Sequence, residues 1–334
     1  MPRSMLLVVV LAIASGEALA ADDFYQGKTI RLVVGSDVGG GYDSYARTFA
    51  QHLRKHIPGE PAVVVQNMPG AGGIVATNWL YNVAPKDGLV IGLSQRGVPF
   101  QPFFGEKNTV FVPTAFNWIG SFNADTAITT TWHTSKVRTM EDAFRETAMM
   151  GGSGPNDSET NPSLMNNTLG TRFRVVGGYR SNTAVWLAME RGEVEGIAGS
   201  WSSLKAQKPH WLRDKQVNIL VQVGRNKHPD LPDVPMITDY VKTDESRAMW
   251  SVMAAMVEMG RPLAAPPGTP KELVALLRAG FEATMKDPAF VAEMEGSQRE
   301  LSPVDGAAMQ HMLEEVGAMP PAVLTKMNGF IKRN

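Results

Sequence analysis

Short apolar runs alternate with segments of helical periodicity in the first third of the chain. Three of these runs have the length and composition of buried strands, and each is followed by a turn. The segments between them repeat apolar residues every three or four positions, as a helix face packed on a sheet does. This alternation predicts a βαβαβ unit with a parallel sheet covered by helices. The predicted strands are residues 29–34, 62–65 and 89–93, and the helical apolar positions are Ala46, Phe49, Ala50, Leu53 and Ile57, then Ala76, Trp79, Leu80 and Val83.

A second alternation of the same kind follows Trp132 and predicts a second α/β lobe. An apolar run at residues 253–257 predicts a strand that crosses back, so that the tail completes the first lobe. The predicted division is residues 1–20 as a signal peptide, 21–125 plus 251–334 as the first lobe, and 126–250 as the second lobe. The remaining predicted helices are near residues 139–148, 183–191, 270–285, 288–294, 304–316 and 321–331, and the remaining predicted strands are 173–176, 194–198 and 217–223.

Two glycine-rich turns each end a predicted strand and open a predicted helix. The first glycine turn is residues 35–43 and the second is residues 69–73. Glycines in turns often serve backbone conformation alone, since glycine adopts positive φ at little cost. A turn at a helix start also leaves backbone N–H groups without intrahelical partners, and these groups favour an anion. Because both turns lie at carboxyl ends of strands, where open α/β sheets bind ligands, the pair predicts a site that grips a carboxylate.

The N-terminus has the layout of a cleaved secretory signal. Arg3 precedes an apolar run at residues 5–13, and the segment ends in the small-residue stretch Ala18-Leu19-Ala20. This run is too short to span a bilayer. The chain of 334 residues has no cysteine, so an exported form depends on a large core rather than on disulfides. We expect a soluble periplasmic protein and, because the formal net charge is only −1, no nucleic-acid partner.

Several short motifs follow one another along the chain, and each alone is weak. They are Gly39-Gly40-Gly41-Tyr42-Asp43, Val64-Val65-Gln66-Asn67-Met68-Pro69-Gly70-Ala71-Gly72-Gly73, Ala84-Pro85-Lys86-Asp87-Gly88, Ser153-Gly154-Pro155, Gly178-Tyr179-Arg180-Ser181, Gly192-Glu193-Val194-Glu195, Leu231-Pro232-Asp233-Val234-Pro235 and Ala265-Pro266-Pro267-Gly268-Thr269-Pro270. As an ordered set that covers nearly all of the chain after the signal, they resemble the Bug-type substrate-binding proteins of tripartite tricarboxylate transporters.

This resemblance implies a two-lobed, type II-like periplasmic binding protein that closes on a small organic carboxylate and delivers it to integral membrane permease subunits. It implies a monomer with no enzymatic activity, no cofactor and no metal, and a ligand that is a di- or tricarboxylate or an aromatic carboxylate. Carried over by motif position, the first-lobe contacts are Ser36, Gly40, Asp43, Gly70, Ala71 and Gly72. The second-lobe contacts are Ser153, Ser158, Tyr179, Ser181, Asn182 and Ser200.

The chain departs from the family pattern at both walls of the predicted site. Family members usually have Pro-Phe-x-Pro before the first glycines, whereas this chain has a hydroxyl at Ser36 and an acid at Asp37. Many members have an aspartate after the strand near residue 198, where this chain continues to Ser200 and Trp201. Trp201 is expected either to pack in the core or, because it follows a strand end, to stack on the ligand.

Charged residues near the turns have two interpretations each. Asp43 is expected to cap the following helix or to contact the ligand. Arg96 follows the strand at 89–93, at the same sheet edge as the turns, and is expected either to pair with a ligand carboxylate or to be a surface arginine. Arg180 has the same two interpretations in the second lobe.

Other functions remain as alternatives. A periplasmic sensor that presents its ligand to a membrane receptor or kinase has the same requirements for binding. A nucleotide-dependent enzyme is a more remote alternative, because the second turn has Val75 where a dinucleotide fingerprint has its third glycine, and neither turn has a P-loop lysine. His52 and His56 have the spacing of a metal-ligand pair, but no third ligand accompanies them in the sequence.

Overall fold

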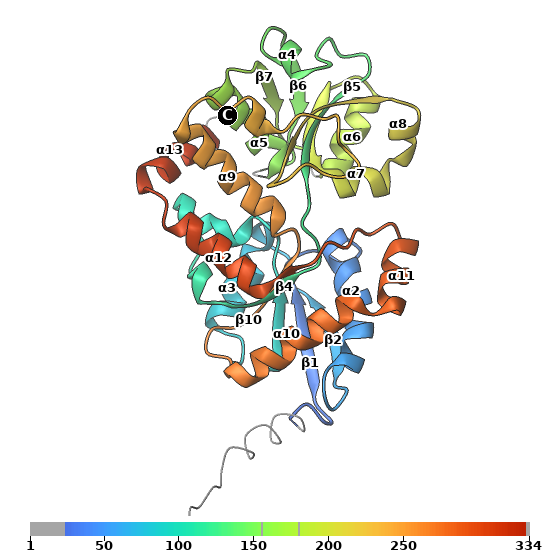
Figure 1. Ribbon diagram of the computed structural model, residues 1–334, viewed down its shortest axis with the longest axis vertical. Helices are drawn as coiled ribbons and strands as arrows, with labels where there is room; N and C mark the ends of the chain where they lie inside the picture. Colours follow the sequence, from blue (N-terminus) through green and yellow to red (C-terminus); the bar gives the residue numbers. More distant parts are fainter. Residues whose placement is uncertain (1–23, 155, 180, 332–334) are drawn as a thin grey trace, which may run out of the picture.

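Two β-sheets, one in each lobe of Figure 1, organise the chain. The computed structural model describes residues 24–154, 156–179 and 181–331. The predicted signal peptide at residues 1–20 and Arg180, for which both interpretations stay open, lie outside the described residues. Within them, no helix has both the length and the apolar composition needed to cross a membrane.

The sheet of the first lobe has the order β11-β4-β10-β3-β1-β2. Strand β1 pairs in parallel with β2 and β3, as the βαβαβ prediction requires, whereas β10 and β11 pair antiparallel with their neighbours. The strands are β1 (Thr29–Val34), β2 (Ala62–Asn67), β3 (Val90–Leu93), β4 (Asn117–Ser121), β10 (Pro262–Ala265) and β11 (Val304–Asp305). The helical segments that accompany them are α2 (Gly41–Leu53), η1 (Arg54–His56), η2 (Ala71–Gly73), α3 (Ile74–Asn82), η3 (Val98–Phe104), η4 (Pro113–Ala115), α10 (Lys271–Lys286), α11 (Pro288–Gly296) and α12 (Gly306–Gly317).

The sheet of the second lobe has the order β7-β6-β8-β5-β9. Strand β6 is parallel to β7 and β8, and β5 is antiparallel to β8 and β9. The strands are β5 (Ala127–Trp132), β6 (Ala148–Gly151), β7 (Phe173–Val176), β8 (Gly196–Ser200) and β9 (Val217–Val223). The helical segments are α4 (Met140–Ala143), α5 (Asp157–Leu169), α6 (Asn182–Glu190), α7 (Trp201–Gln207), α8 (Pro209–Arg213) and η5 (Ile237–Asp239).

Both sheets are therefore mixed: each contains antiparallel pairs beside the parallel pairs that were expected to dominate. β5 is the first strand after the chain passes from the first lobe to the second, and β10 is the first strand after it returns. Each of these strands starts at the edge that faces the other lobe and runs antiparallel to its neighbours. The two-lobed α/β class itself is confirmed.

The apolar run at residues 253–257 is not a strand. It belongs to α9 (Asp244–Glu258), because Ala and Met are strong helix formers and the helix is buried along much of its length. The strand that returns to the first sheet is β10, nine residues after the start of that run. The helix predicted near 139–148 is also too long, since Ala148–Gly151 forms β6.

The last helices pack along one side of both lobes. One buried apolar cluster contains Leu80 of the first lobe, Met165 of the second, Trp250 of α9 and Leu313 of α12. The terminal helix α13 (Pro321–Ile331) contacts α5 and α9. Figure 1 shows α9, α12 and α13 beside one another on this side. The lobes are thus joined there by a continuous core as well as by the crossing segments.

Candidate functional site

Hydrogen bonds connect the loops after β1, β2 and β3 at the carboxyl edge of the first sheet. The side-chain amide of Asn67, the last residue of β2, donates to Ser36 O at 3.0 Å and to Asp43 Oδ1 at 2.9 Å. Gln95, after β3, donates from Nε2 to Gly35 O at 3.1 Å. These bonds hold the first glycine turn between its two neighbouring loops, as the parallel order of the strands predicts.

Asp43 holds the first glycine turn in shape from inside. Its side chain is 2 % exposed, and Oδ2 accepts the Gly39 N–H at 2.8 Å and Arg47 Nε at 2.9 Å. The hydrogen bond from Arg47 and those from Gly39 and Asn67 outweigh burial and lower the pKa of Asp43 to about 2. The N-cap of α2 is Gly40, so the prediction that Asp43 caps this helix is wrong.

Ser36 presents a buried hydroxyl in the same turn. Its Oγ has no hydrogen-bond partner among the described residues. A buried polar atom without a partner is costly, and such atoms are usually paired with protein or water. A ligand oxygen at this place would remove that cost. Gly40 is half-buried and Asp37 is exposed, both on the same turn.

The second glycine turn has an unusual backbone. Gly70, Ala71, Gly72 and Gly73 have φ angles of 134°, 44°, 62° and 97°. Positive φ is strained for alanine, and such strain is often found at functional sites. The turn leads directly into α3, and two of its amides are bonded within the turn: the Gly73 N–H donates to Gly70 O at 2.9 Å and the Ile74 N–H donates to Ala71 O. Both predicted turns are therefore real helix-opening turns at neighbouring strand ends.

Arg96 is engaged rather than solvated, which excludes the surface alternative. Its side chain is 16 % exposed, Nη1 donates to Asp125 Oδ2 at 2.8 Å, and Nη2 pairs with Asp157. Its backbone N–H donates to the Tyr42 hydroxyl at 3.0 Å, which in turn donates to Gly260 O at 3.0 Å. Neither acid lies in a recognisable motif, so only Arg96 of this cluster could be singled out from the sequence.

A second arginine lies beside this cluster, on the segment that returns from the second lobe. The Arg261 guanidinium is 4.0 Å from the Tyr45 ring centroid, Nη1 donates to Asn123 Oδ1 at 2.7 Å, and Nε has no partner among the described residues. Burial alone would raise the pKa of Asp125, but the guanidinium groups of Arg96 and Arg261 outweigh it and hold that pKa below its ordinary value. Asp125 therefore stays ionised between two cations.

The second lobe contributes hydroxyls and amides from the loops after β6, β7 and β8. Ser153 Oγ donates to Asn182 Oδ1 at 2.7 Å, and its backbone N–H donates to Ser158 Oγ at 2.9 Å. Ser181 caps α6 and Ser200 caps α7. The structure thus brings Ser153, Ser158 and Asn182 into one network. Ser181 serves the start of α6, and Ser200 both caps α7 and hydrogen-bonds to Asp125.

Two predicted aromatic contacts are mainly packing residues in this arrangement. Trp201 is 5 % exposed and belongs to the second-lobe core, with the His228 ring 6.0 Å away. Its Nε1 is buried and has no hydrogen-bond partner among the described residues. Tyr179 is partly buried against the same core.

Ion pairs join the two lobes edge to edge. Asp157 begins α5 in the second lobe and pairs with Arg96 of the first. His228 Nε2, after β9, lies 2.9 Å from Glu300 Oε1 in the first lobe, and Arg225 Nη2 lies 2.9 Å from Glu315 of α12. The glycine turns and the second-lobe network therefore lie on edges that face each other.

The pair of His52 in α2 and His56 in η1 has a structural role. His52 Nε2 lies 2.9 Å from Glu293 Oε2, and η1 places His56 Nε2 2.9 Å from Asp287 Oδ2. Hydrogen bonds from Lys55 and His56 hold the pKa of Asp287 well below its usual range. In the described part of the chain, no group of three or more His, Asp or Glu side chains is arranged to hold a metal ion.

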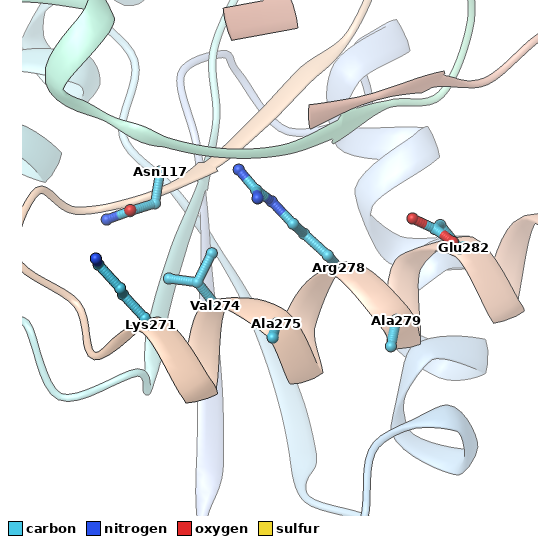
Figure 2. Close-up of a pocket in the computed structure, with 7 residues that line it drawn as sticks. All are labelled: Asn117, Lys271, Val274, Ala275, Arg278, Ala279 and Glu282. Atoms are coloured by element: carbon cyan, nitrogen blue, oxygen red, sulfur yellow. The ribbon is translucent and has the colours of Figure 1, made fainter. Parts of the chain in front are cut away.

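A surface cavity of about 530 Å³ lies elsewhere, along α10 (Figure 2). Lys271 and Arg278 face Asn117 across it, and Asn117 begins β4. Because β4 runs in the same direction as β1, this cavity starts at the opposite edge of the sheet from the glycine turns. None of the predicted ligand contacts lines it.

A family model and curated relatives of this chain point to the same family. The family described as tripartite tricarboxylate transporter family receptor matches residues 45–323. A UPF0065 protein of Bordetella bronchiseptica is 25 % identical over 327 residues, which cover 92 % of this chain and 88 % of that protein. Protein BugT of Bordetella pertussis is 35 % identical over 102 residues, 30 % of each chain.

Solved structures show the same fold. A TctC solute-binding protein from Polaromonas has a TM-score of 0.71 at 20 % identity, with 93 % of this chain and all of that chain covered. The periplasmic binding protein BugD has a TM-score of 0.64 at 22 % identity, with 91 % and 99 % covered. An R. palustris protein solved with adipate has a TM-score of 0.67 at 18 % identity, with 91 % and 98 % covered.

Proposed function

Because the chain belongs to the receptor family of tripartite tricarboxylate transporters, we propose that it captures a small organic carboxylate between its lobes and delivers it to a membrane transporter of that type. The family match confirms the resemblance noted in the sequence and makes the chain a solute-binding protein rather than an enzyme. The carboxylate, the closing motion and the permease partner belong to the proposal.

The feature that supports a carboxylate most strongly is the first glycine turn. It combines the start of α2 with the buried, unpartnered Ser36 Oγ, and Asn67 and Asp43 fix its shape. A carboxylate accepts hydrogen bonds at both oxygens and is favoured at a helix N-terminus. Such a ligand would use the hydroxyl and the turn amides without needing a free cation.

The second glycine turn adds a further set of donors at the neighbouring strand end. Each charge-assisted hydrogen bond contributes about 1.5 to 3 kcal/mol, so three or four of them would account for roughly micromolar affinity after the costs of association. The network of Ser153, Ser158 and Asn182 then offers neutral polar groups to the distal end of the ligand.

The arrangement of the two edges supports capture by lobe closure. The ion pairs that cross between the lobes lie beside the predicted contacts, so a ligand held there would touch both lobes. The predicted signal peptide and the family both support a periplasmic protein, which binds its solute outside the inner membrane.

The test is a ligand screen on the chain without its signal peptide. A panel of mono-, di- and tricarboxylates is added, and the melting temperature is compared with that in chloride at matched ionic strength. At least one carboxylate should raise the melting temperature by mass action. If none does, while NAD or ATP does, the proposal is wrong.

A further inference from the structure

The guanidinium of Arg96 is shared between two carboxylates of the protein itself. Nη1 binds Asp125 and Nη2 binds Asp157, and all three side chains are at least four-fifths buried. An arginine fork is well suited to two such partners. With Arg261, whose guanidinium also acts on Asp125, the cluster has two cations and two anions and no net charge.

The two acids are held in different ways. Asp125 is 4 % exposed, its Oδ1 accepts the Thr126 N–H at 2.9 Å, and its own N–H donates to Val257 O at 3.2 Å. Asp157 is 14 % exposed and is the first residue of α5, on the opposite lobe from Arg96. Separation of the lobes therefore breaks the bond to Asp157, whereas Asp125 lies on the segment next to β4 and is fixed there.

Arg96 is also a neighbour of the first glycine turn. Its N–H is bonded to the hydroxyl of Tyr42, which lies in that turn, and the adjacent Gln95 is bonded to Gly35. These bonds place the backbone of Arg96 beside the turn, and its side chain extends from there to Asp125 and Asp157. A molecule with one carboxylate in the turn has to span that side chain to meet the guanidinium with its other end.

We infer that Arg96 is the place for a second ligand carboxylate, that Asp157 occupies this place in the empty protein, and that the ligands are therefore short dicarboxylates. This inference rests on the proposed function, since the first carboxylate is taken to lie at the glycine turns. Asp157 is then a specificity-determining residue, because a ligand must compete with it.

Charge balance makes exchange the favourable route. A ligand carboxylate added beside Asp157 would bring the part-buried cluster to −1, and like charges at close range oppose one another. A ligand carboxylate that replaces Asp157 keeps the cluster neutral and keeps both sides of the fork occupied. The released Asp157 remains at the N-terminus of α5, where a negative charge is stabilised.

The experiment measures affinities for succinate, adipate and the monocarboxylate butyrate by titration calorimetry. Asp157→Asn should bind succinate or adipate more tightly than the unaltered protein, by about three- to tenfold, because the competitor is gone. Butyrate binding should stay unchanged. The matched control is Asp214→Asn, which removes the same charge from an exposed pair with Arg213 in the second lobe and should change nothing.

A double variant tests whether the tighter dicarboxylate binding of Asp157→Asn depends on the Arg96 guanidinium. In Arg96→Gln/Asp157→Asn the gain for dicarboxylates should disappear, since the two positions are coupled through one contact. Melting curves without ligand show that each variant is folded, and Asp157→Ser serves if the asparagine variant is not.

The outcomes separate the two claims. Weaker or unchanged dicarboxylate binding by Asp157→Asn would overturn the exchange and leave carboxylate capture standing. Butyrate binding as tight as that of the dicarboxylates in the unaltered protein would overturn the exchange in the same way. Failure of every carboxylate to bind every variant would overturn the proposed function and this inference with it.

Discussion

Asp157 at the start of α5 binds the guanidinium of Arg96 in the opposite lobe, so one ion pair connects the carboxyl edges of the two sheets. The same guanidinium binds Asp125 on the crossing segment. The lobes thus face each other through a charged contact beside the glycine turns, and a ligand between them has to fit within that arrangement.

Removal of the Ser36 hydroxyl should affect binding and not folding. Its Oγ is buried without a partner, so Ser36→Ala should leave the free energy of unfolding unchanged or raise it by up to about 1 kcal/mol. The affinity for a bound carboxylate should fall by roughly fivefold, because the ligand loses one donor. Urea unfolding and titration calorimetry measure the two effects, and a loss of stability with unchanged affinity would contradict this role.

Asp43 should make stability depend on pH in the acid range. Its pKa is lowered to about 2 in the folded protein, against about 3.9 when unfolded, so its contribution is complete above pH 4 and is lost as the pH falls towards 2. The contribution should be about 1 to 2 kcal/mol. Urea unfolding of the unaltered protein and of Asp43→Asn at pH 7 to 3 should give a difference that shrinks only below pH 4. A difference that is constant down to pH 3 would contradict this assignment.

Bulk at the second glycine turn should block the ligand while the fold is kept. Gly72 has a φ of 62°, and an added Cβ would meet no atom within 4 Å. Gly72→Val should therefore cost only backbone strain of about 1 to 3 kcal/mol and should abolish carboxylate binding.

Gly105 provides the matched control for this variant. It ends η3 at a φ of 69°, and its surroundings are equally open, but it lies outside both turns. Gly105→Val should lose similar stability and keep its affinity. Unchanged affinity in Gly72→Val would move the site away from the second turn.

Trp201 should behave as a core residue. Because it is 5 % exposed within the second-lobe core, Trp201→Phe should change carboxylate affinity by less than about twofold and stability by about 1 kcal/mol. Intrinsic fluorescence of the unaltered protein provides a second check, since a ligand stacked on this ring would quench it. Strong loss of affinity in the phenylalanine variant would restore the stacking alternative.

Regular periodicity explains why much of the fold was predictable. Strands 29–34, 173–176 and 217–223 match β1, β7 and β9 as predicted, because each is a short apolar run with clear ends. The run at 253–257 was misassigned because five apolar residues fit a buried helix as well as a strand, and only packing decides between them. Helix α5 was missed, because its sequence is rich in Asn, Ser and Thr and contains Pro162.

The candidate site was predictable where the local backbone defines it. Glycine turns 35–43 and 69–73 follow neighbouring parallel strands, and Arg96 follows the third strand, so their shared edge could be inferred from chain order. Asp125 and Asp157 could not be inferred. Asp157 meets Arg96 only across the two lobes, and Asp125 lies between β4 and β5 in no recognisable motif. Contacts between lobes leave no periodic trace in the sequence.

A crystal structure of the chain with a bound carboxylate tests carboxylate capture most directly. The account predicts a carboxylate between the lobes, with its oxygens within about 3.2 Å of Ser36 Oγ and of backbone N–H groups of the glycine turns. A carboxylate bound elsewhere, such as in the cavity along α10, with Ser36 Oγ still unpartnered, would contradict it.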